Sequence, residues 1–582
     1  MSVQSFGQAA DLTAARPVRH NAAGLDRSLL IQWSTFAATI VLVIGPLLPI
    51  IYQSFVDRPL YRDGQLFTLG NYTSIATDGG FWTVIANSLV FALLSTIVAQ
   101  VAGVLFAILV GRTDMPGRRI IGNLVLWPLF LSPLLLSMGW FVLYGPAGYA
   151  TMAVRMSLGF EPWSLYSLAG MSLVAGVAQA PLTVLYCLAS TALADPRLED
   201  AARSCGATPL RAMLRISLPM LLPAIMFSAV LNFINALESL SIPLIFGQPA
   251  GIRLFMTFIY EEAFSGLQPN YGIVGSAAVV LLALISVLIW LQRRLLGDPR
   301  RFNSVGGKAA RPRPLPLGGL RWPAFALAML YALAFVILPL GAVVLRAFVP
   351  VLTPLIPFWQ MLSLGNFQAL LASGLAARAI GNTLAIALSA AVLGTLFATM
   401  VAMVVEKSPF RGRRPLEYVA LFPRAVPGMI AGVGILYVLL FVPQLGWLRN
   451  SIWIIILAYV GRALPTGLGA VSPALTRISP DLDRAARVVG ADWWTSMRLV
   501  VLRLTAPALF ASFALMFIGF IKEYSTAIFL VAPGSEVLGV SILQAWNQGN
   551  AGGAAALATV QILLLVTFLF LARKLLGVKM HG

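Results

Sequence analysis

The chain has 582 residues, of which 59% are hydrophobic and only 10% are charged, and its mean hydropathy is +0.87. About a quarter of the residues of a typical soluble protein are charged, so this composition excludes a water-soluble globular protein. The formal net charge of +19 does not indicate a nucleic-acid-binding protein, because the basic residues form no face with interleaved aromatic side chains.

The apolar residues gather into blocks long enough to cross a bilayer, which takes about 20 residues for one helix. We therefore predict an all-α polytopic membrane protein with about twelve transmembrane helices. In chain order, the predicted spans are 31–55, 84–110, 120–144, 165–191, 219–247, 271–292, 323–348, 379–405, 416–441, 451–475, 506–532 and 555–574. The ninth span contains Pro423 and Pro427, and its counterpart contains Pro128 and Pro133, so interrupted helices are expected there.

Basic residues concentrate in every second loop between the predicted spans. The loops after the second, fourth, sixth, eighth and tenth spans are rich in arginine, whereas the loop near 533–554 contains no basic residue. By the positive-inside rule, the basic loops and both termini are predicted to face the cytoplasm. Residues 1–28 contain no apolar core, so no cleavable signal is expected and the first span itself must direct insertion.

The two halves of the chain repeat each other. Several segments recur 295 positions later and others 284 positions later, and one net insertion of 11 residues in the first half reconciles these registers. The first set pairs Leu69–Tyr72 with Leu364–Phe367, Asn87–Leu89 with Asn382–Leu384, Gly117–Arg119 with Gly412–Arg414, and Pro128 with Pro423. The second set pairs Pro181, Pro196, Gly206 and Pro223 with Pro465, Pro480, Gly490 and Pro507. Such self-similarity indicates a duplicated architecture.

This repeat predicts two parallel halves of six helices each, related by a pseudo-twofold axis along the membrane normal, with a pathway at their interface. We divide the chain into a cytoplasmic tail at 1–28, a first transmembrane domain at 29–296, a cytoplasmic linker at 297–322 and a second transmembrane domain at 323–582. The linker is assigned from its proline and basic residues. The chain is therefore predicted to be a fused pseudo-dimer.

The cytoplasmic loop after the fourth span of each half carries the most specific motif. The two copies read Asp200-Ala201-Ala202-Arg203-Ser204-Cys205-Gly206 and Arg484-Ala485-Ala486-Arg487-Val488-Val489-Gly490. Each follows a capping residue and a proline, Asp195-Pro196 or Ser479-Pro480, which is typical of a helix start. Because glycine is conformationally permissive, we predict a short helix that ends at this glycine, followed by a turn and a second amphipathic stretch on the cytoplasmic surface.

Both loops resemble the EAA motif of binding-protein-dependent ABC importer permeases, which forms a helix that docks in a groove of the ATPase subunit. The resemblance implies the type I transmembrane domain of ABC importers. It implies these ATPase-coupling residues: Asp200, Ala201, Ala202, Gly206, Leu218, Pro219, Asp483, Ala485, Ala486, Gly490 and Leu502. The second copy departs from the motif, with Arg484 at the acidic position and Arg503 at the proline position. Either Asp483 replaces the acid, or this half docks more weakly; an ordinary amphipathic loop is the alternative interpretation.

The resemblance implies two copies of an ABC ATPase, a periplasmic or lipid-anchored substrate-binding protein and membrane lipids as partners, in the bacterial inner membrane. No nucleic-acid partner is expected. The sequence contains no Gly-x-x-x-x-Gly-Lys-Ser/Thr phosphate loop, so ATP is expected to be used by the partner subunits. No cofactor, metal site or catalytic residue is predicted, since the only histidines are His20 and His581 and the two cysteines form no cluster with them.

Two further segments resemble fused ferric-iron permeases. These are 522–538 in the second half and 238–252 in the first. Ferric iron is therefore the first substrate hypothesis, although related permeases handle thiamine, polyamines or aminoethylphosphonate. The predicted function is solute import by alternating access. An ion-coupled secondary transporter is the alternative from another class, although parallel repeats and marked cytoplasmic loops disfavour it.

Five ionisable residues fall within predicted spans, where a charge costs about 2.5–3.5 kcal/mol on insertion scales. Glu238, Glu523, Arg424 and Arg462 are the candidate residues of a translocation path, and Lys522 adjoins them. One hypothesis places the two glutamates at related sites lining the path for a cation. The other pairs the charges internally, for example Arg462 or Arg424 with Glu523.

Overall fold

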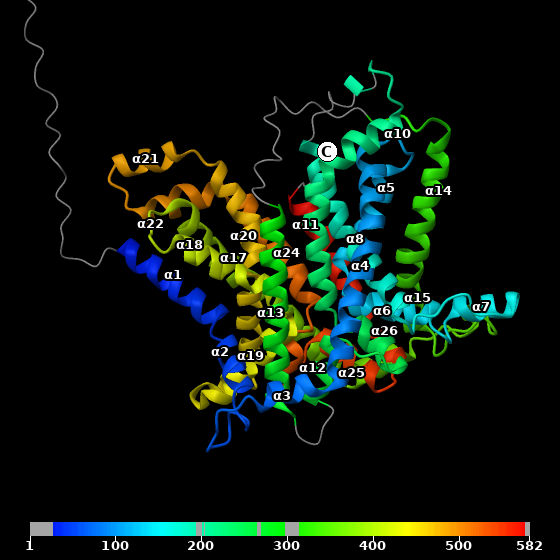
Figure 1. Cartoon of the computed structure of the whole chain (residues 1–582), viewed down its shortest axis with the longest axis horizontal. Coiled ribbons are helices and arrows are strands. Elements are labelled where there is room, and N and C mark those ends of the chain that lie inside the picture. Colours follow the sequence, from blue (N-terminus) through cyan, green and yellow to red (C-terminus); the bar gives the residue numbers. More distant parts are fainter. Residues whose placement is uncertain (1–26, 194–200, 203, 265–268, 297–313, 577–582) are drawn as a thin grey trace, which may run out of the picture.

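The computed structural model describes residues 27–193, 201–202, 204–264, 269–296 and 314–576 (Figure 1). The regular structure of these residues is helical, apart from isolated β-bridges between Val56 and Phe67 and between Thr113 and Leu315. Eight helices in this part of the chain are long and apolar enough to cross a membrane, and the number rises to twelve if each bent helix pair is one span. The all-α polytopic prediction is confirmed.

The first half contains the long helices α4 (Gly79–Arg112), α8 (Leu168–Leu193), α11 (Leu218–Leu237) and α13 (Tyr271–Leu296). Its other helices are α1 (Arg27–Val43), α2 (Leu47–Ser54), α3 (Gly70–Thr77), α5 (Arg118–Leu126), α6 (Pro133–Tyr144), α7 (Tyr149–Leu158), α10 (Pro209–Ala212) and α12 (Phe255–Phe264). Short 3-10 or π turns are η1 (Trp127–Phe130), η2 (Met213–Ser217), η3 (Pro243–Gly247) and η4 (Gln248–Ala250).

The second half repeats this order. Its helices are α14 (Arg321–Ala332), α15 (Leu338–Phe348), α16 (Gly365–Ala372), α17 (Leu375–Lys407), α18 (Arg413–Leu421), α19 (Gly428–Phe441), α20 (Ile452–Arg477), α21 (Pro480–Val488), α22 (Trp493–Ser496), α23 (Leu502–Leu504), α24 (Ala506–Ile521), α25 (Leu538–Asn547) and α26 (Ala551–Leu576). The short turns are η6 (Gly318–Leu320), η7 (Leu333–Ile337), η8 (Phe358–Gln360), η9 (Phe422–Ala425), η10 (Pro443–Leu448), η11 (Met497–Val501) and η12 (Ala527–Phe529).

The predicted interrupted helices are confirmed. The helix that begins at Arg118 bends by 108° before α6, and the helix that begins at Arg413 bends by 109° before α19. Pro133 occupies the first turn of α6, and the Ser132 hydroxyl accepts a hydrogen bond from the Leu134 amide at 3.3 Å. Proline lacks an amide hydrogen and suits a helix start, so the chain restarts here as a new helix rather than continuing the old one.

Two predicted spans extend too far. The prediction carried apolar helix through 219–247 and 506–532, whereas α11 ends at Leu237 and α24 at Ile521. A charged residue follows each end, Glu238 in the first half and Lys522 in the second. The turn that follows each helix leaves these charged side chains at the boundary between the halves, where each contacts a polar group of the other half.

The repeated sequence motifs make matched contacts in the two halves. The Asn71 side chain donates to the Ser54 carbonyl at 3.1 Å, and Asn366 donates to the Ala347 carbonyl at 3.0 Å. The Ser88 hydroxyl accepts from the amide of Phe255, the first residue of α12, at 2.8 Å. Its counterpart Thr383 accepts in the same way from the first residue of α25 at 2.7 Å. The sequence repeat is therefore a structural repeat as well.

The last part of the predicted linker contacts the end of α4 and the residues after it. The Leu315 amide donates to the Arg112 carbonyl at 2.7 Å, and the Leu317 amide donates to the Asp114 carboxylate at 2.8 Å. The chain then enters α14 at Arg321, one residue before the predicted end of the linker. Residues 297–313 of the predicted linker and residues 1–26 of the predicted tail lie outside the described part of the chain.

Each half packs its first span against the other half. α2 lies on α19, and α15 lies on α6. The contacts are so close that a Cβ added at Gly434 would lie 2.3 Å from the Pro46 carbonyl oxygen, and one added at Gly139 would lie 2.3 Å from the Pro339 carbonyl oxygen. Gly139 and Gly434 are 295 positions apart, so they are equivalent residues of the repeat. The first span of each half therefore packs on the other half at the same position of the repeat.

Because of this close approach, Gly434→Ala is expected to destabilise the folded chain by about 1–3 kcal/mol, the usual cost of overpacking. Thermal unfolding of the detergent-purified protein measures the loss. Gly381→Ala on α17 is the matched control, because nothing lies within 4 Å of a Cβ added there. Equal unfolding temperatures for the two variants would contradict the tight interface between α2 and α19.

Candidate functional site

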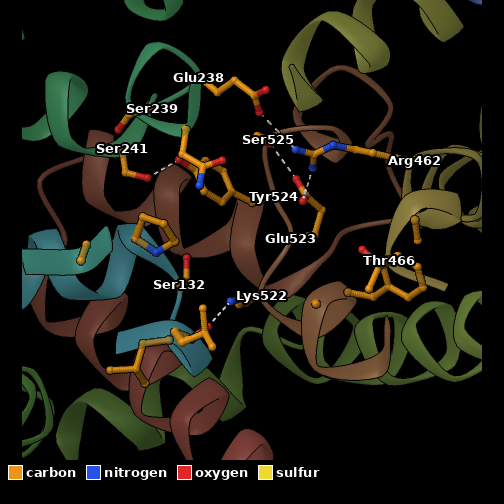
Figure 2. A pocket seen from close by; sticks show the side chains of 18 of the residues that line it. Ser132, Glu238, Ser239, Ser241, Arg462, Thr466, Lys522, Glu523, Tyr524 and Ser525 are labelled. Atoms are coloured by element: carbon orange, nitrogen blue, oxygen red, sulfur yellow. Dashed lines mark hydrogen bonds and ion pairs between the residues drawn. The ribbon is translucent and has the colours of Figure 1, made fainter. Parts of the chain in front are cut away.

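A cavity of about 530 Å³ lies where the two halves meet. Its walls come from the breaks before α6 and α19, from the middle of α8 and α20, and from the ends of α11 and α24 (Figure 2). Its polar lining side chains other than the charged ones are Ser132, Gln179, Asn235, Ser239, Ser241, Tyr459, Thr466, Tyr524 and Ser525. The interrupted helices thus supply polar groups to a space that unbroken apolar spans would fill.

All five ionisable residues singled out in the spans line this cavity. Glu238 and Lys522 are the residues that terminate α11 and α24, and Glu523 follows directly. Arg424 lies in η9 at the break of the ninth predicted span, and Arg462 lies within α20. Residues from both halves therefore converge on one site, although they are up to 285 positions apart in the sequence.

Arg462 joins an acidic residue from each half. Its guanidinium contacts the Glu523 carboxylate through Nη1 and lies 3.7 Å from Glu238 Oε2 through Nη2. Figure 2 shows the three side chains pointing toward one another. Each is less than a third exposed, at 27% for Arg462, 16% for Glu238 and 19% for Glu523. The internal pairing proposed for Arg462 and Glu523 is therefore present, and the same residues also face the cavity.

The Glu523 carboxylate is held by further donors. Its Oε1 accepts from the Ser525 hydroxyl at 2.6 Å and from the Thr526 amide at 3.1 Å. Tyr459 donates to the Glu523 backbone carbonyl at 3.0 Å. A buried carboxylate is tolerated when a cation and several hydrogen bonds satisfy it, so Glu523 is fixed in place at this position.

Two further contacts cross the interface beside this group. Lys522 donates to the backbone carbonyl of Leu129 in η1, and Ser241 shares a hydrogen bond with the Tyr524 hydroxyl (Figure 2). Both join the first half to the second. Ser241 and Tyr524 lie within the segments 238–252 and 522–538 that resemble ferric-iron permeases, but neither they nor Leu129 were among the predicted site residues.

The two surface loops adopt the same local structure. Gly206 has φ +85° and Gly490 has φ +89°, in the left-handed region that favours glycine. The amide of Ala207 donates to the Ala202 carbonyl at 3.0 Å, and that of Ala491 donates to the Ala486 carbonyl at 3.1 Å. This six-to-one hydrogen bond is the helix ending of a Schellman motif, so the predicted helix-breaking glycine is confirmed in both copies.

The structure gives the predicted coupling residues matched environments. Ala201 and Ala485 are exposed, and Ala202 and Ala486 are half-buried. Leu218 and Pro219 form the first turn of α11, and Leu502 opens α23. Asp200 lies outside the described residues. Figure 1 places α10 and α21 at the same end of the helix bundle, opposite α3, α12 and α25.

The second loop has a different arrangement of charge from the motif. Asp483 accepts a hydrogen bond from the Ser496 hydroxyl at 2.7 Å, which ties α21 to α22. Arg484 pairs with Asp481 at 3.3 Å on the exposed surface. The Asp492 carboxylate accepts from the Thr495 amide at 2.9 Å, and hydrogen bonding from Thr495 lowers the pKa of Asp492. These contacts stabilise the loop internally.

The second loop is also fixed to the membrane bundle. The Trp493 indole donates to the Lys407 carbonyl at 3.0 Å, and the Lys407 ammonium donates to the Ile478 carbonyl at 2.8 Å. Lys407 is the last residue of α17, so the loop contacts the end of a long span. Val488 and Val489 at the tip remain 86% and 84% exposed. A partner that displaced this loop would therefore move helix ends with it.

A duplicated helical bundle with a charged cavity at its pseudo-twofold interface and paired surface loops has the architecture of a transporter permease. Residues 99–301 and 392–581 match the family described as binding-protein-dependent transport system inner membrane component. The chain belongs to this family, and it is an ABC importer permease with two fused copies of the family's domain.

Three relatives show the breadth of the family. The ferric transport system permease protein FbpB of Actinobacillus pleuropneumoniae is 26% identical over 545 residues, covering 90% of this chain and 77% of that protein. The probable ABC transporter permease protein y4fN of Sinorhizobium fredii is 24% identical, covering 93% of each chain. The putative 2-aminoethylphosphonate transport system permease protein PhnV of Salmonella paratyphi A is 28% identical over 209 residues, covering 35% of this chain and 78% of that protein.

A solved structure was also matched. It is the crystal structure of a bacterial ABC transporter involved in the import of the acidic polysaccharide alginate. The matched chain is 18% identical with a TM-score of 0.36, and the match covers 44% of this chain and 96% of that chain.

Removing the positive charge of Arg462 should destabilise the folded chain, because Glu238 and Glu523 would lose the cation that they share. Arg462→Gln leaves Glu238 and Glu523 without their cation, and breaking a buried pair in this way costs about 3–5 kcal/mol. A lower unfolding temperature of the purified protein is the expected result. Adding Glu523→Gln to Arg462→Gln removes one unpaired charge and should restore part of the loss. Simple additivity of the two substitutions would contradict a direct interaction.

Proposed function

We propose that this chain forms the transmembrane pathway of an ATP-driven importer and carries its solute inward by alternating access. Two copies of an ABC ATPase would bind the loops around Gly206 and Gly490. A periplasmic or lipid-anchored binding protein would deliver the solute at the opposite end. In this proposal the chain itself hydrolyses no ATP and binds no cofactor. It lies in the bacterial inner membrane with both termini in the cytoplasm.

The observation that carries this proposal is the matched geometry of the two loops. Each combines an alanine pair, a Schellman ending and a left-handed glycine at the same end of the bundle. The small alanine side chains allow close approach of a partner surface. Because Leu218 and Leu502 begin the helical segments that lead to the cavity, a force applied at either loop would reach the ends of α11 and α24.

The two halves also contact each other at the end of the bundle opposite the loops, where α12 and α25 lie. Asn547 of α25 lies 3.4 Å from the Tyr260 hydroxyl of α12, as donor to acceptor. The rings of Phe264 and Phe529 stack with centroids 4.8 Å apart. Parting of these contacts would admit solute from a docked binding protein. They support the proposal of a gate that opens when the two loops are drawn together.

Ferric iron is the proposed solute, on the support of the sequence likeness to permeases described as ferric transport proteins. Thiamine, polyamines and aminoethylphosphonate are the alternatives to be tested in parallel. Cells that lack this chain, complemented with the wild-type gene, should accumulate radiolabelled iron supplied as ferric citrate. Accumulation should cease when the partner ATPase carries an inactivating Walker lysine substitution. Undiminished uptake with the inactive ATPase would instead support an ion-coupled transporter.

Substitution of the loop glycines should separate coupling from folding. Gly206→Val and Gly490→Val each place a β-branched residue at a positive φ, which strains the turn although nothing lies within 4 Å of the added Cβ. Uptake should fall by about tenfold or more while membrane insertion is retained, since a displaced coupling helix loses its contact with the ATPase.

Gly159→Val is the matched control for these variants. Gly159 has φ +78° and open surroundings, but it follows α7, away from both loops. The same backbone strain should therefore leave uptake unchanged. Equal loss of uptake in the Gly159 and Gly206 variants would show that the loops have no special role.

A further inference from the structure

The lining of the cavity contains more positive than negative charge. Its basic residues are Arg424, Arg462 and Lys522, and its acidic residues are Glu238 and Glu523. These groups lie within or at the ends of membrane-spanning segments, where an uncompensated charge is expensive and marks a functional site. The excess positive charge therefore calls for a compensating anion or for water inside the cavity.

The two acidic residues of the cavity lining already have partners within the protein. Both glutamates share the Arg462 guanidinium, and the second oxygen of Glu523 accepts from Ser525 and Thr526. A bare metal cation would have to displace Arg462 to reach these carboxylates. That exchange would leave the guanidinium unpaired at the same depth, so the arrangement disfavours direct coordination of a cation.

The remaining basic residues form no ion pair within 4 Å in the described part of the chain. Lys522 donates to the Leu129 carbonyl, a neutral acceptor. Arg424 is exposed to the cavity, and among the described residues neither an ion pair nor a hydrogen bond engages its guanidinium. A guanidinium presents a planar set of donors that matches the oxygens of a carboxylate, sulfate or phosphonate in a bidentate manner.

The cavity is also larger than a bare ion requires. Its volume of about 530 Å³ falls within the range of small-molecule sites, roughly 300–1,000 Å³. Ser132 and Ser239 place hydroxyl donors on the first-half wall, and the hydrogen-bonded pair of Ser241 and Tyr524 retains one further hydroxyl hydrogen. The space and its donors fit a polar solute that has several oxygen atoms.

We propose that the solute enters the cavity as an oxyanion or as an anionic metal chelate, with its oxygens bound by Arg424 and Lys522. This inference rests on the proposed import function and narrows its substrate class. Iron would then cross as a negatively charged carboxylate complex. A carboxylate, sulfate or phosphonate without metal shares the same chemistry, and the binding of each to the purified chain separates these sources.

Binding to the purified full chain in lipid nanodiscs tests the proposal without transport. The probes are citrate, ferric citrate, sulfate and 2-aminoethylphosphonate, with spermidine as the cationic comparison. A ligand that binds the folded state raises the unfolding temperature in a saturable way. At least one oxyanion should do so for the wild type, and Arg424→Gln should abolish the shift. Arg424→Lys should keep part of it, because one positive charge remains.

The control is Arg449→Gln, whose arginine is exposed and lies outside the cavity lining. It should retain the full shift. Since Arg424 forms no ion pair among the described residues, Arg424→Gln is expected to fold with unchanged stability in the absence of probe. A stabilisation by spermidine, or an oxyanion shift that survives Arg424→Gln, would overturn the proposal.

Uptake of the oxyanion by cells provides a second, independent test. Arg424→Glu reverses the charge beside the solute, and like-charge contact should lower oxyanion uptake by about tenfold or more. Unchanged or increased uptake in this variant would contradict anion passage. If wild-type cells showed no ATP-dependent uptake while the oxyanion shift persisted in nanodiscs, the import function would fail and the cavity's preference for oxyanions would stand.

Discussion

The central interaction is the shared pairing of Arg462 with one acid from each half. A single guanidinium from α20 contacts Glu238 at the end of α11 and Glu523 at the end of α24. Because these groups are mostly buried, the pairing is a geometric constraint as much as a source of stability. It sets the separation of the two helix ends, and with it the width of the cavity that they enclose. Any motion that widens the interface must lengthen these contacts.

The exchange of first spans gives the rest of the bundle a complementary role. α2 and α15 each pack closely on the opposite half, where Gly434 and Gly139 allow backbone contact. In the proposed transport cycle, such contacts would keep the halves together while the polar contacts around the cavity separate. The proposal therefore assigns the cohesion of the assembly to the closely packed interfaces of α2 and α15, and the transport motion to the polar interface around the cavity.

Much of this architecture could be predicted from sequence. The length of the apolar blocks predicted the spans, and the shared offsets between repeated segments predicted the duplication. The spacing of the alanine pair and the glycine predicted the two loops and their turns. The same approach failed where a local pattern does not encode its tertiary context. It carried helix past Leu237 and Ile521, because apolar residues resume after the charged ones and only the packed structure shows that the chain turns.

The side-chain contacts at the cavity could likewise be predicted only in part from the sequence. Arg462 and Glu523 were proposed as a pair from their charge alone, but the shared contact with Glu238 depends on the way three helices meet. Ser241 and Tyr524 lie within the segments that resemble ferric-iron permeases, but no local pattern indicates that the two hydroxyls meet across the interface. Whether the four charged residues form a translocation path stays a prediction, as does the docking of an ATPase on the two loops.

The most direct test of the proposed gate is a distance between the halves. Spin labels on Glu262→Cys and Gln548→Cys, with Cys205→Ser to remove the exposed native thiol, report on α12 and α25 at the end opposite the loops. The complex with its ATPase should show a longer distance when ATP is trapped than when nucleotide is absent. An unchanged distance in an ATPase-active complex would contradict alternating access between these halves.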